Sequence, residues 1–353
     1  LYALDAAKGT NQWHFSTGGR IDSPPTVYAG QVLFGSHDGW VYCLRAADGQ
    51  LAWKYRAAPT DRTIMVRGQL ESAWPVPGNI LVKNGVAYFS VGRSSFLDGG
   101  IRIYALNARS GELLHELTLD GPWPDLSEDA GDCYGMDGAK SDILVSSGST
   151  IHLGFNSFDD ELVPQPLTAP DKDGKRSVAK HLMPGNGFLD HTWYDRVAWS
   201  YDTTWQGRFY KWDRQPRSGQ LLVFDDACTY ALKGYPQKTF MSPKFTPGEG
   251  YQLRADTNEI LAQADYERGM RWAVRSNVRA YGLVLAGETL FLAGSEDLIP
   301  EDDPYRALDG RAGALLQAVS TVDGTVRSTL KLDAPPVFDG MIAAQSRLYI
   351  CLL

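Results

Sequence analysis

Cysteine is scarce in this sequence, and its four copies are spread along the whole chain. Cys43, Cys133, Cys228 and Cys351 form neither a CxxC pair nor an adjacent pair, which argues against zinc sites or vicinal disulfides built on such pairs. Basic residues are also in the minority: 34 Lys and Arg stand against 42 Asp and Glu, a net charge of −8. Because a phosphate backbone is bound by a basic surface, this balance argues against a nucleic-acid partner.

Long apolar runs and common catalytic motifs are missing as well. No run approaches the roughly 18 apolar residues of a membrane-spanning helix, so we expect no membrane span. The sequence contains no GxSxG, no HExxH, no phosphate loop and no GxGxxG before a helix. Its six histidines are dispersed, and no two are four residues apart. The first residues show none of the features of a targeting signal, so they do not identify the compartment.

What the sequence does contain is a repeated hairpin of about 15 residues. Residues 1–15 read LYALDAAKGTNQWHF, residues 41–55 read VYCLRAADGQLAWKY, and residues 103–117 read IYALNARSGELLHEL. Tyrosine, leucine, glycine and tryptophan recur in fixed columns, with histidine in the last column of the third copy. The columns hold Tyr2, Tyr42 and Tyr104; Leu4, Leu44 and Leu106; Gly9, Gly49 and Gly111; and Trp13, Trp53 and His115. A weaker copy at 316–330 keeps Gly324 but has Ser328 in the tryptophan column.

A second hairpin pattern stands before the tyrosine strand of the repeat. It consists of two apolar strands around a turn glycine, and it occurs at 25–39, 80–95, 142–155 and 282–297. Joined in order, the two hairpins make a four-stranded antiparallel meander. An array of such small sheets predicts an all-β fold, a β-propeller whose blades are these four-stranded meanders.

The ends of the chain complement each other in this pattern. Residues 337–353 read as the first two strands of a blade, and residues 1–15 read as the last two. We expect them to pair into one blade, the clasp, which closes the ring and removes exposed sheet edges. The chain 1–353 is then a single propeller domain.

Six is the blade number that the pattern favours, with seven or eight possible. Two stretches do not fit the blade pattern, and we interpret 163–190 and 236–271 as loop insertions. The blades predicted besides the clasp are 25–57, 79–119, 141–180, 194–235 and 280–333.

Topology predicts where a ligand binds. In such a meander, the loop between the second and third strands and the loop to the next blade emerge on the same face. The unusual loop segments and most tryptophans fall on this face, which predicts a pocket with a few polar groups among aromatic walls. The candidate ligand-binding residues are Glu71, Trp74, Arg93, Asp98, Lys140, Asp142, Arg196 and Trp199. We assign no catalytic and no metal-ligating residue.

Several of these residues also have a structural interpretation. Arg93 with Asp98, and Lys140 with Asp142, could be ion pairs that tie loops together. Trp74 could pack between blades, and the same holds for Trp272.

The repeats at 1–15 and 41–55 resemble those of pyrroloquinoline-quinone-like (PQQ-like) propellers, in which a tryptophan follows a DxxTG-like turn. LDAAKGTNQW and LRAADGQLAW match this pattern, and LNARSGELLH matches it without the tryptophan. The resemblance covers residues 1–120 and recurs weakly over 280–350. GQLESAWPV and GRSSFLDGG are similar to stretches of bacterial secreted propeller proteins of the planctomycete type. The resemblance implies a periplasmic or extracellular protein.

The same resemblance bears on cofactors. Quinoprotein dehydrogenases hold the quinone between a tryptophan and a vicinal disulfide, and they bind calcium through Glu, Asn and Asp. This chain has no adjacent cysteines, no recognisable calcium set and no CxxCH haem motif, so we expect neither PQQ nor calcium as cofactor. Another branch of the superfamily consists of non-catalytic lipoprotein scaffolds of outer-membrane protein assembly, which bind partners through loops and strand edges.

We therefore predict a non-catalytic binding or scaffold module, whose partner is an unknown small molecule, glycan or protein. Two enzymatic alternatives stay open. One is a quinone- or metal-dependent dehydrogenase. The other is a carbohydrate-active lyase or hydrolase, for which His191, Tyr194 and Arg196 are the nearest candidates for acid–base catalysis.

Overall fold

The computed structural model of the chain describes residues 1–121, 139, 141–169, 176–184, 199–205, 215–234, 250–261 and 268–353. The chain divides into two compact units: Leu1–His181 with Gly187–Asp195, and Leu182–Asn186 with Arg196–Leu353. In the described ranges the regular elements are antiparallel strands, and no α-helix occurs. Within these ranges there is accordingly no helix of the length and hydrophobicity that could cross a membrane.

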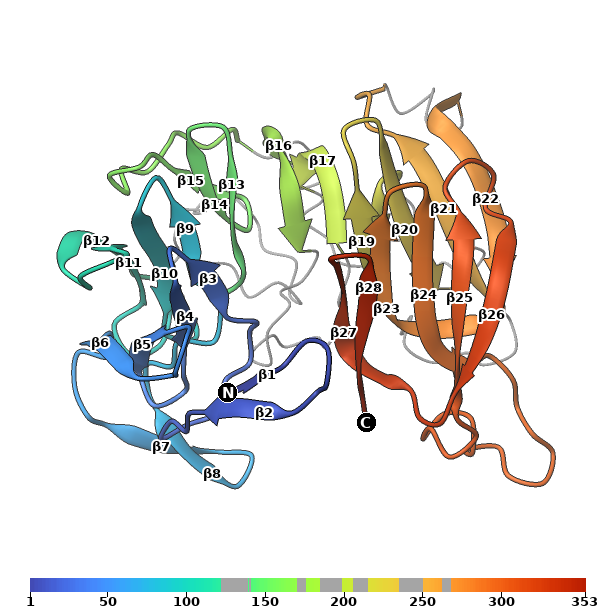
Figure 1. The fold of residues 1–353 in the computed structure, drawn as a ribbon. Coiled ribbons are helices and arrows are strands. Elements are labelled where there is room, and N and C mark those ends of the chain that lie inside the picture. The colour runs from blue at the N-terminus through green and yellow to red at the C-terminus, as the bar shows by residue number, and fades with distance from the viewer. Residues whose placement is uncertain are drawn as a thin grey trace. The chain divides into compact units, whose positions relative to one another are not determined.

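The first unit is built from consecutive antiparallel hairpins (Figure 1). One four-stranded sheet has the order β3 (Thr26–Tyr28), β4 (Gln31–Gly35), β5 (Trp40–Arg45) and β6 (Leu51–Arg56). The next has the order β9 (Leu81–Lys83), β10 (Val86–Val91), β11 (Ile101–Asn107) and β12 (Leu113–Leu119). A three-stranded sheet follows, with β13 (Leu144–Ser147), β14 (Thr150–Leu153) and β15 (Asn156–Phe158). Two-stranded sheets are formed by β1 (Tyr2–Leu4) with β2 (Asn11–His14), and by β7 (Thr63–Val66) with β8 (Gln69–Ser72).

The second unit repeats this architecture. Strand β16 (Arg176–Pro184) crosses the boundary between the units, and β17 (Trp199–Trp205) pairs with β18 (Ser218–Gly219). Two four-stranded sheets follow in chain order. They consist of β19 (Leu221–Phe224), β20 (Cys228–Gly234), β21 (Tyr251–Thr257) and β22 (Met270–Ser276); and of β23 (Val278–Ala286), β24 (Thr289–Glu296), β25 (Ala314–Ser320) and β26 (Val326–Leu332). The chain ends with the hairpin of β27 (Pro336–Ala344) and β28 (Arg347–Leu352).

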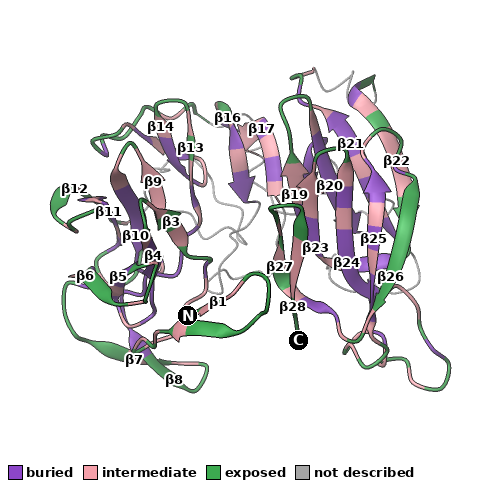
Figure 2. Ribbon diagram, viewed as in Figure 1, coloured by how far each residue is buried: buried purple, intermediate pink, exposed green. Residues whose placement is uncertain are grey.

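Burial falls from the middle strands to the last strand of each four-stranded sheet. Strand β10 is almost entirely buried, whereas β26 is exposed along nearly its whole length (Figure 2). The apolar cores lie between neighbouring sheets, with Leu33 and Phe89 in the first unit and Leu253 and Leu292 in the second. Alternating apolar residues thus place one sheet face against the next, as the hairpin pattern predicts.

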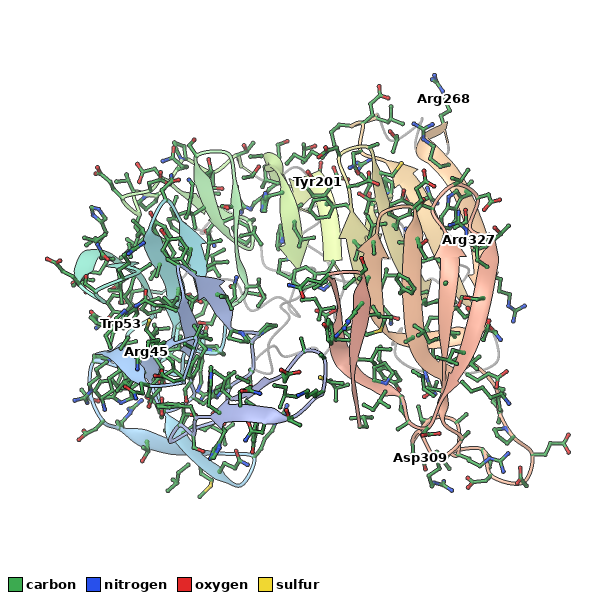
Figure 3. The ribbon with its side chains drawn as sticks, in the orientation of Figure 1. Arg45, Trp53, Tyr201, Arg268, Asp309 and Arg327 are labelled. Carbon is green, nitrogen blue, oxygen red and sulfur yellow. The ribbon has the colours of Figure 1, made fainter. Side chains whose placement is uncertain are left out.

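The glycine and tryptophan columns of the repeat meet across neighbouring sheets. A ring atom of Trp13 lies 2.6 Å from the position that a Cβ atom of Gly49 would occupy. The Trp53 ring, which Figure 3 marks on β6, stands in the same way 2.7 Å from the Cβ position of Gly111. Gly49 and Gly111 have φ of 70° and 74°, a backbone conformation that favours glycine. The packed tryptophan ring also leaves no space for a larger residue.

Trp272 extends this arrangement to the second unit. It lies on β22, its ring is 2.7 Å from the Cβ position of Gly324, and its Nε1 donates to the Thr321 carbonyl at 2.8 Å. Trp13 donates in the same way to the Ala46 carbonyl, at 3.0 Å. The interpretation of Trp272 as a packing residue between sheets is therefore confirmed.

The predicted strand boundaries agree with the structure in part. The segments 25–57, 79–119 and 280–333 each form one four-stranded sheet. The blade predicted at 194–235 is wrong, because β19 and β20 form a sheet with β21 and β22. Residues Tyr251–Thr257 and Met270–Ser276 are thus strands, although the sequence places them in or beside an insertion. The segment 163–190 likewise contains a strand, β16.

Both halves of the predicted clasp are hairpins. Strands β1 and β2 pair with each other, as do β27 and β28, and each pair is a sheet of two strands. Because one hairpin belongs to the first unit and the other to the second, their pairing into one blade stays a prediction, as does the single-domain assignment.

Candidate functional site

The site begins with a hairpin that stands outside the four-stranded sheets. Strands β7 and β8 follow β6, and their turn at Arg67-Gly68 has positive φ at both residues. Glu71 pairs with Ile64, and the neighbouring pair is Met65 with Leu70. Since side chains alternate along a strand, the two pairs point to opposite faces of the hairpin. Ile64 packs on the core of the unit, whereas Met65 and Leu70 are 67% and 64% exposed.

The carboxylate of Glu71 is buried among basic side chains. Its side chain is 1% exposed, and Oε2 lies 2.8 Å from Nδ1 of His37 and 3.0 Å from Nη2 of Arg93. Its other oxygen lies 3.4 Å from Nε of Arg20. Arg93 also donates to the backbone carbonyl of Ser72, at 3.2 Å. Glu71 therefore joins the hairpin to three other loops of the first unit.

His37 continues this network to a second carboxylate. Its Nε2 lies 2.8 Å from Oδ2 of Asp22, and Asp22 also lies 3.2 Å from Nε of Arg20. Each ring nitrogen of the buried His37 thus lies 2.8 Å from a carboxylate oxygen, one of Glu71 and one of Asp22. We call these five residues the Glu71 network: Arg20, Asp22, His37, Glu71 and Arg93.

The electrostatics of the network keep Glu71 ionised. Burial raises the pKa of its carboxyl, but the hydrogen bonds from His37 and Arg93, together with the charges of His37 and Arg20, outweigh burial and lower the pKa below its usual value. An ionised carboxylate that is held by a histidine and two arginines is a poor general base and a poor metal ligand. The network is suited to hold loops in place.

A second group of contacts ties the hairpin to the loop at 92–100. Nε1 of Trp74 donates to the backbone carbonyl of Asp98 at 2.8 Å. Arg62 stacks on the Trp74 ring, with 5.0 Å between the guanidinium carbon and the ring centroid, and it forms an ion pair with Asp98. Asp98 has a positive φ of 58°, which turns its carbonyl toward the indole in a tight loop closed by Gly99 and Gly100. The two loop segments singled out in the sequence thus form one assembly.

The exposed residues of this assembly include four large apolar side chains. Met65 and Leu70 of the hairpin are exposed, and so are Phe96 and Leu97 of the 92–100 loop. We call these four side chains the apolar loop surface. Exposed apolar side chains that are concentrated on two joined loops are typical of a site that contacts another molecule.

The predicted site residues have different outcomes. Glu71 contacts Arg93, and Trp74 contacts Asp98, as neighbouring members of the assembly. The suggested pair of Arg93 with Asp98 is replaced by two others, Arg93 with Glu71 and Arg62 with Asp98. The structural interpretation of these residues as loop ties is therefore right in kind, although the partners differ.

The other predicted residues stand apart from this assembly or outside the description. Asp142 is buried, and its Oδ1 accepts the backbone N–H of Ile143 at 2.7 Å. Trp199 begins β17 in the second unit. Lys140 and Arg196 lie outside the described residues, as do His191 and Tyr194.

Sequence reasoning missed three of the five residues of the Glu71 network. Arg20 and Asp22 lie in the loop that leads into β3, and His37 lies in the loop between β4 and β5. Both loops emerge on the face where the strand topology predicts the site, so this topology could have indicated these residues. A single histidine or arginine in a polar loop carries no spacing signal of its own.

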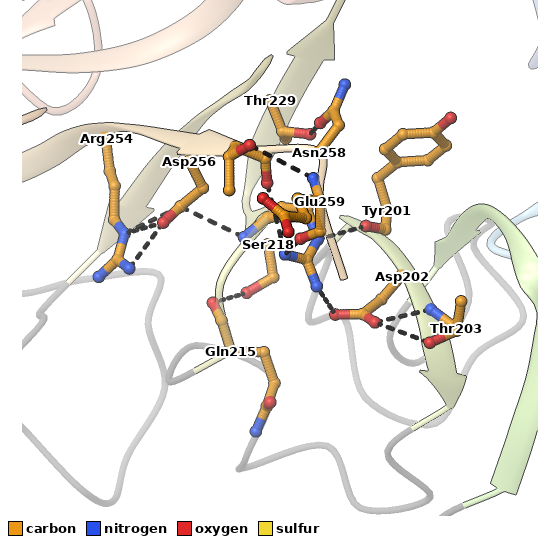
Figure 4. Close-up of polar contacts among 12 residues, drawn as sticks. Tyr201, Asp202, Thr203, Gln215, Ser218, Thr229, Arg254, Asp256, Asn258 and Glu259 are labelled. Atoms are coloured by element: carbon orange, nitrogen blue, oxygen red, sulfur yellow. Dashed lines mark hydrogen bonds and ion pairs between the residues drawn. The ribbon is translucent and has the colours of Figure 1, made fainter. Parts of the chain in front are cut away.

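A further buried charge group holds the second unit together. Arg217 is fully buried, and its Nη2 lies 2.7 Å from Oδ2 of Asp202. Its remaining nitrogens donate to the carbonyls of Tyr201 at 3.1 Å and Glu259 at 3.1 Å (Figure 4). Asp256 accepts the Arg217 backbone N–H and pairs with Arg254. These acceptors lie on strands or directly beside them, so the group links neighbouring strands and has a structural role.

Comparison with known proteins agrees with this architecture. Residues 1–128 match the family model described as outer membrane protein assembly factor BamB. The quinohemoprotein alcohol dehydrogenase ADHIIG of Pseudomonas putida HK5 has a similar structure, with a TM-score of 0.50 and 13% identity over 99% of this chain and 66% of that chain. Residues 1–128 therefore match a PQQ-like repeat family, and the fold of the chain is that of a β-propeller.

Two further solved structures are similar to this chain at low sequence identity. A europium-containing methanol dehydrogenase matches with a TM-score of 0.50 and 13% identity, over 99% of this chain and 78% of that chain. BamB from Moraxella catarrhalis matches with a TM-score of 0.47 and 12% identity, over 97% and 83%. No curated protein matches the sequence. At such identities the likeness shows the fold alone, and the planctomycete-type resemblance stays a prediction.

Proposed function

We propose that this PQQ-like propeller is a non-catalytic binding or scaffold module and that its partner is a protein. One observation carries the proposal: Glu71 and Arg93 of the candidate site hold the loops, and large apolar side chains of the same loops are exposed to solvent. Glu71 and Arg93 contact each other inside the molecule, while Met65, Leu70 and Phe96 are exposed. Apolar side chains on a rigid support contribute binding energy at little cost in ordering entropy.

The setting that we propose is periplasmic or extracellular. The family model that matches residues 1–128 is described as an outer membrane protein assembly factor, which supports a scaffold role next to such assembly. The dehydrogenases of similar fold do not weigh against this, because fold alone does not imply activity.

Site-specific photocrosslinking tests the proposal. A photoreactive phenylalanine analogue replaces Phe96 or Met65, and the protein is irradiated in the cells that produce it. We expect one reproducible protein adduct from both positions, identified by mass spectrometry. Val326, which is 52% exposed on β26, is the matched control and should give no such adduct.

Three outcomes would contradict the proposal. One is the absence of a protein adduct at Phe96 and Met65, and another is an equal adduct from Val326. The third is turnover: oxidation of an alcohol by the purified chain after incubation with quinone and calcium would show an enzyme. A Leu70→Ser variant should weaken the adduct without changing the unfolding midpoint, since this side chain is exposed.

A further inference from the structure

Arg279 in the second unit is a buried cation that forms no ion pair with any residue that the structure describes. It lies near the start of β23, and the residue is 7% exposed. Its Nη2 donates to the Ala307 carbonyl at a long 3.4 Å, and Nε and Nη1 have no hydrogen-bond partner among the described residues. Buried guanidinium groups normally have such partners, so two unused nitrogens require an explanation.

Other buried arginines of this unit show what is missing. Arg217 lies 2.7 Å from Asp202, and Arg254 lies 2.7 Å from Asp256. Near Arg279 in the sheet, Glu296 is exposed and Asp297 accepts the backbone N–H of Gly250 at 2.7 Å. Neither forms an ion pair with Arg279 in the part of the chain that the structure describes.

A second unused donor faces the same side of the sheet. Ser295 on β24 is the register partner of Arg279, so both side chains leave the same face of the strand pair. Its hydroxyl is buried and has no partner among the described residues. Strand β23 has a register shift between Ala280 and Gly282, directly after Arg279, an irregularity that is common beside binding sites.

One loop approaches these donors. Ala307, which accepts the long hydrogen bond from Arg279, belongs to the loop between β24 and β25. Figure 3 marks Asp309 on this loop. The loop is held by its own exposed ion pairs, Asp302 with Arg306 and Asp303 with Arg311. The loop therefore covers Arg279 without supplying a carboxylate to it.

We propose that Arg279 and Ser295 form a binding site for a small oxyanion, either a carboxylate or a phosphate. A guanidinium group does not lose its proton at physiological pH, so the buried charge has to be neutralised by an anion. A guanidinium binds an oxyanion through the edge of Nε and Nη2 or the edge of Nη1 and Nη2. Each edge of Arg279 has one unused nitrogen beside Nη2, whose bond to Ala307 is long, and the hydroxyl of Ser295 adds a further donor. The ligand enters from the side of the 297–313 loop. The site is independent of the apolar loop surface, which belongs to the first unit.

Isothermal titration of the whole chain with sodium phosphate and with sodium succinate tests the site, at constant ionic strength set by chloride. We expect saturable binding of one equivalent of one of the two anions, and the comparison identifies the class. Arg279→Met should weaken binding about tenfold or more, and Ser295→Ala should weaken it about threefold to tenfold, because hydrogen bonds to charged groups are lost. Arg311→Met removes an exposed arginine of the covering loop and should leave the affinity unchanged.

The thermal midpoint provides a readout that is independent of affinity. The preferred anion should raise the midpoint of the wild type and of Arg311→Met, and leave that of Arg279→Met unchanged. If Arg279→Met does not fold, the test depends on Ser295→Ala and on diffraction from crystals soaked in selenate. Anion density at Arg279 would support the site. Absence of binding by either anion, equal binding by Ser295→Ala, or density elsewhere would overturn it.

Discussion

At the residue scale, the repeated tryptophans and glycines pack against each other across neighbouring sheets. The sequence aligns Trp13 with Trp53 and Gly49 with Gly111, and this predicted where the strands and turns are. It did not predict that each tryptophan covers the glycine of the following repeat, because a column says nothing about which copies touch. Trp272 is the clearest example. Its strand follows the long segment 258–269 and not a short glycine turn, so the aligned repeats did not include it.

The packing of tryptophan on glycine predicts unequal effects for two chemically identical substitutions. Gly111→Ala and Gly9→Ala place the same methyl group at similar φ, 74° and 68°, so the backbone strain is matched. The Cβ atom at 111 would lie 2.7 Å from the Trp53 ring, whereas that at 9 has nothing within 4 Å among the described residues. We expect Gly111→Ala to lower the free energy of unfolding by about 1–3 kcal/mol more than Gly9→Ala. Urea unfolding curves measure the difference, and equal losses would contradict the packing role.

The lowered pKa of Glu71 makes a prediction on pH. Since the folded state holds this carboxyl below its usual pKa, the network stabilises the fold above the unfolded pKa, and this stabilisation is lost as the pH falls through the folded pKa. The wild type should therefore lose more stability between pH 6 and pH 3 than Glu71→Gln, which has no proton to gain there. Glu112→Gln, in an exposed turn, should behave like the wild type. If the denaturant midpoints of wild type and Glu71→Gln fall equally across this range, ionised Glu71 does not stabilise the fold through the network.

At the scale of elements, the sequence predicted the regular hairpins well and the irregular ones poorly. Strands β21 and β22 were missed because a longer segment, 258–269, replaces the short turn that marks the other hairpins. The hairpin β7–β8 was read as a loop, although its segment, with Glu71 and Trp74, was placed correctly on the candidate face. A strand pair outside a blade has no period to reveal it. Its position depends on contacts with Arg20, His37 and Arg93, which lie far apart in the sequence.

One of these long-range contacts can be tested by removing a single hydrogen bond. Trp74→Phe keeps an aromatic ring but loses the bond from Nε1 to the Asp98 carbonyl, which contributes about 1 kcal/mol. We expect faster amide exchange in residues 93–99 and little change in β9–β12, measured by hydrogen exchange with mass spectrometry. Trp53→Phe is the control, because Nε1 of Trp53 has no acceptor among the described residues. Unchanged exchange in 93–99 would mean that the indole does not hold this loop.

At the scale of the molecule, the prediction still to be tested is the closure of the ring. The repeat order predicts that β1–β2 and β27–β28 share one blade, and each hairpin exists as expected. A two-stranded hairpin is marginally stable alone, so each should depend on the other if they pair. Deletion of residues 1–15 should then speed amide exchange in residues 337–352, while β23–β26 stay protected. Exchange in 337–352 that is unaffected by the deletion would show that the last hairpin is stabilised within its own unit, and that the two ends do not close the ring.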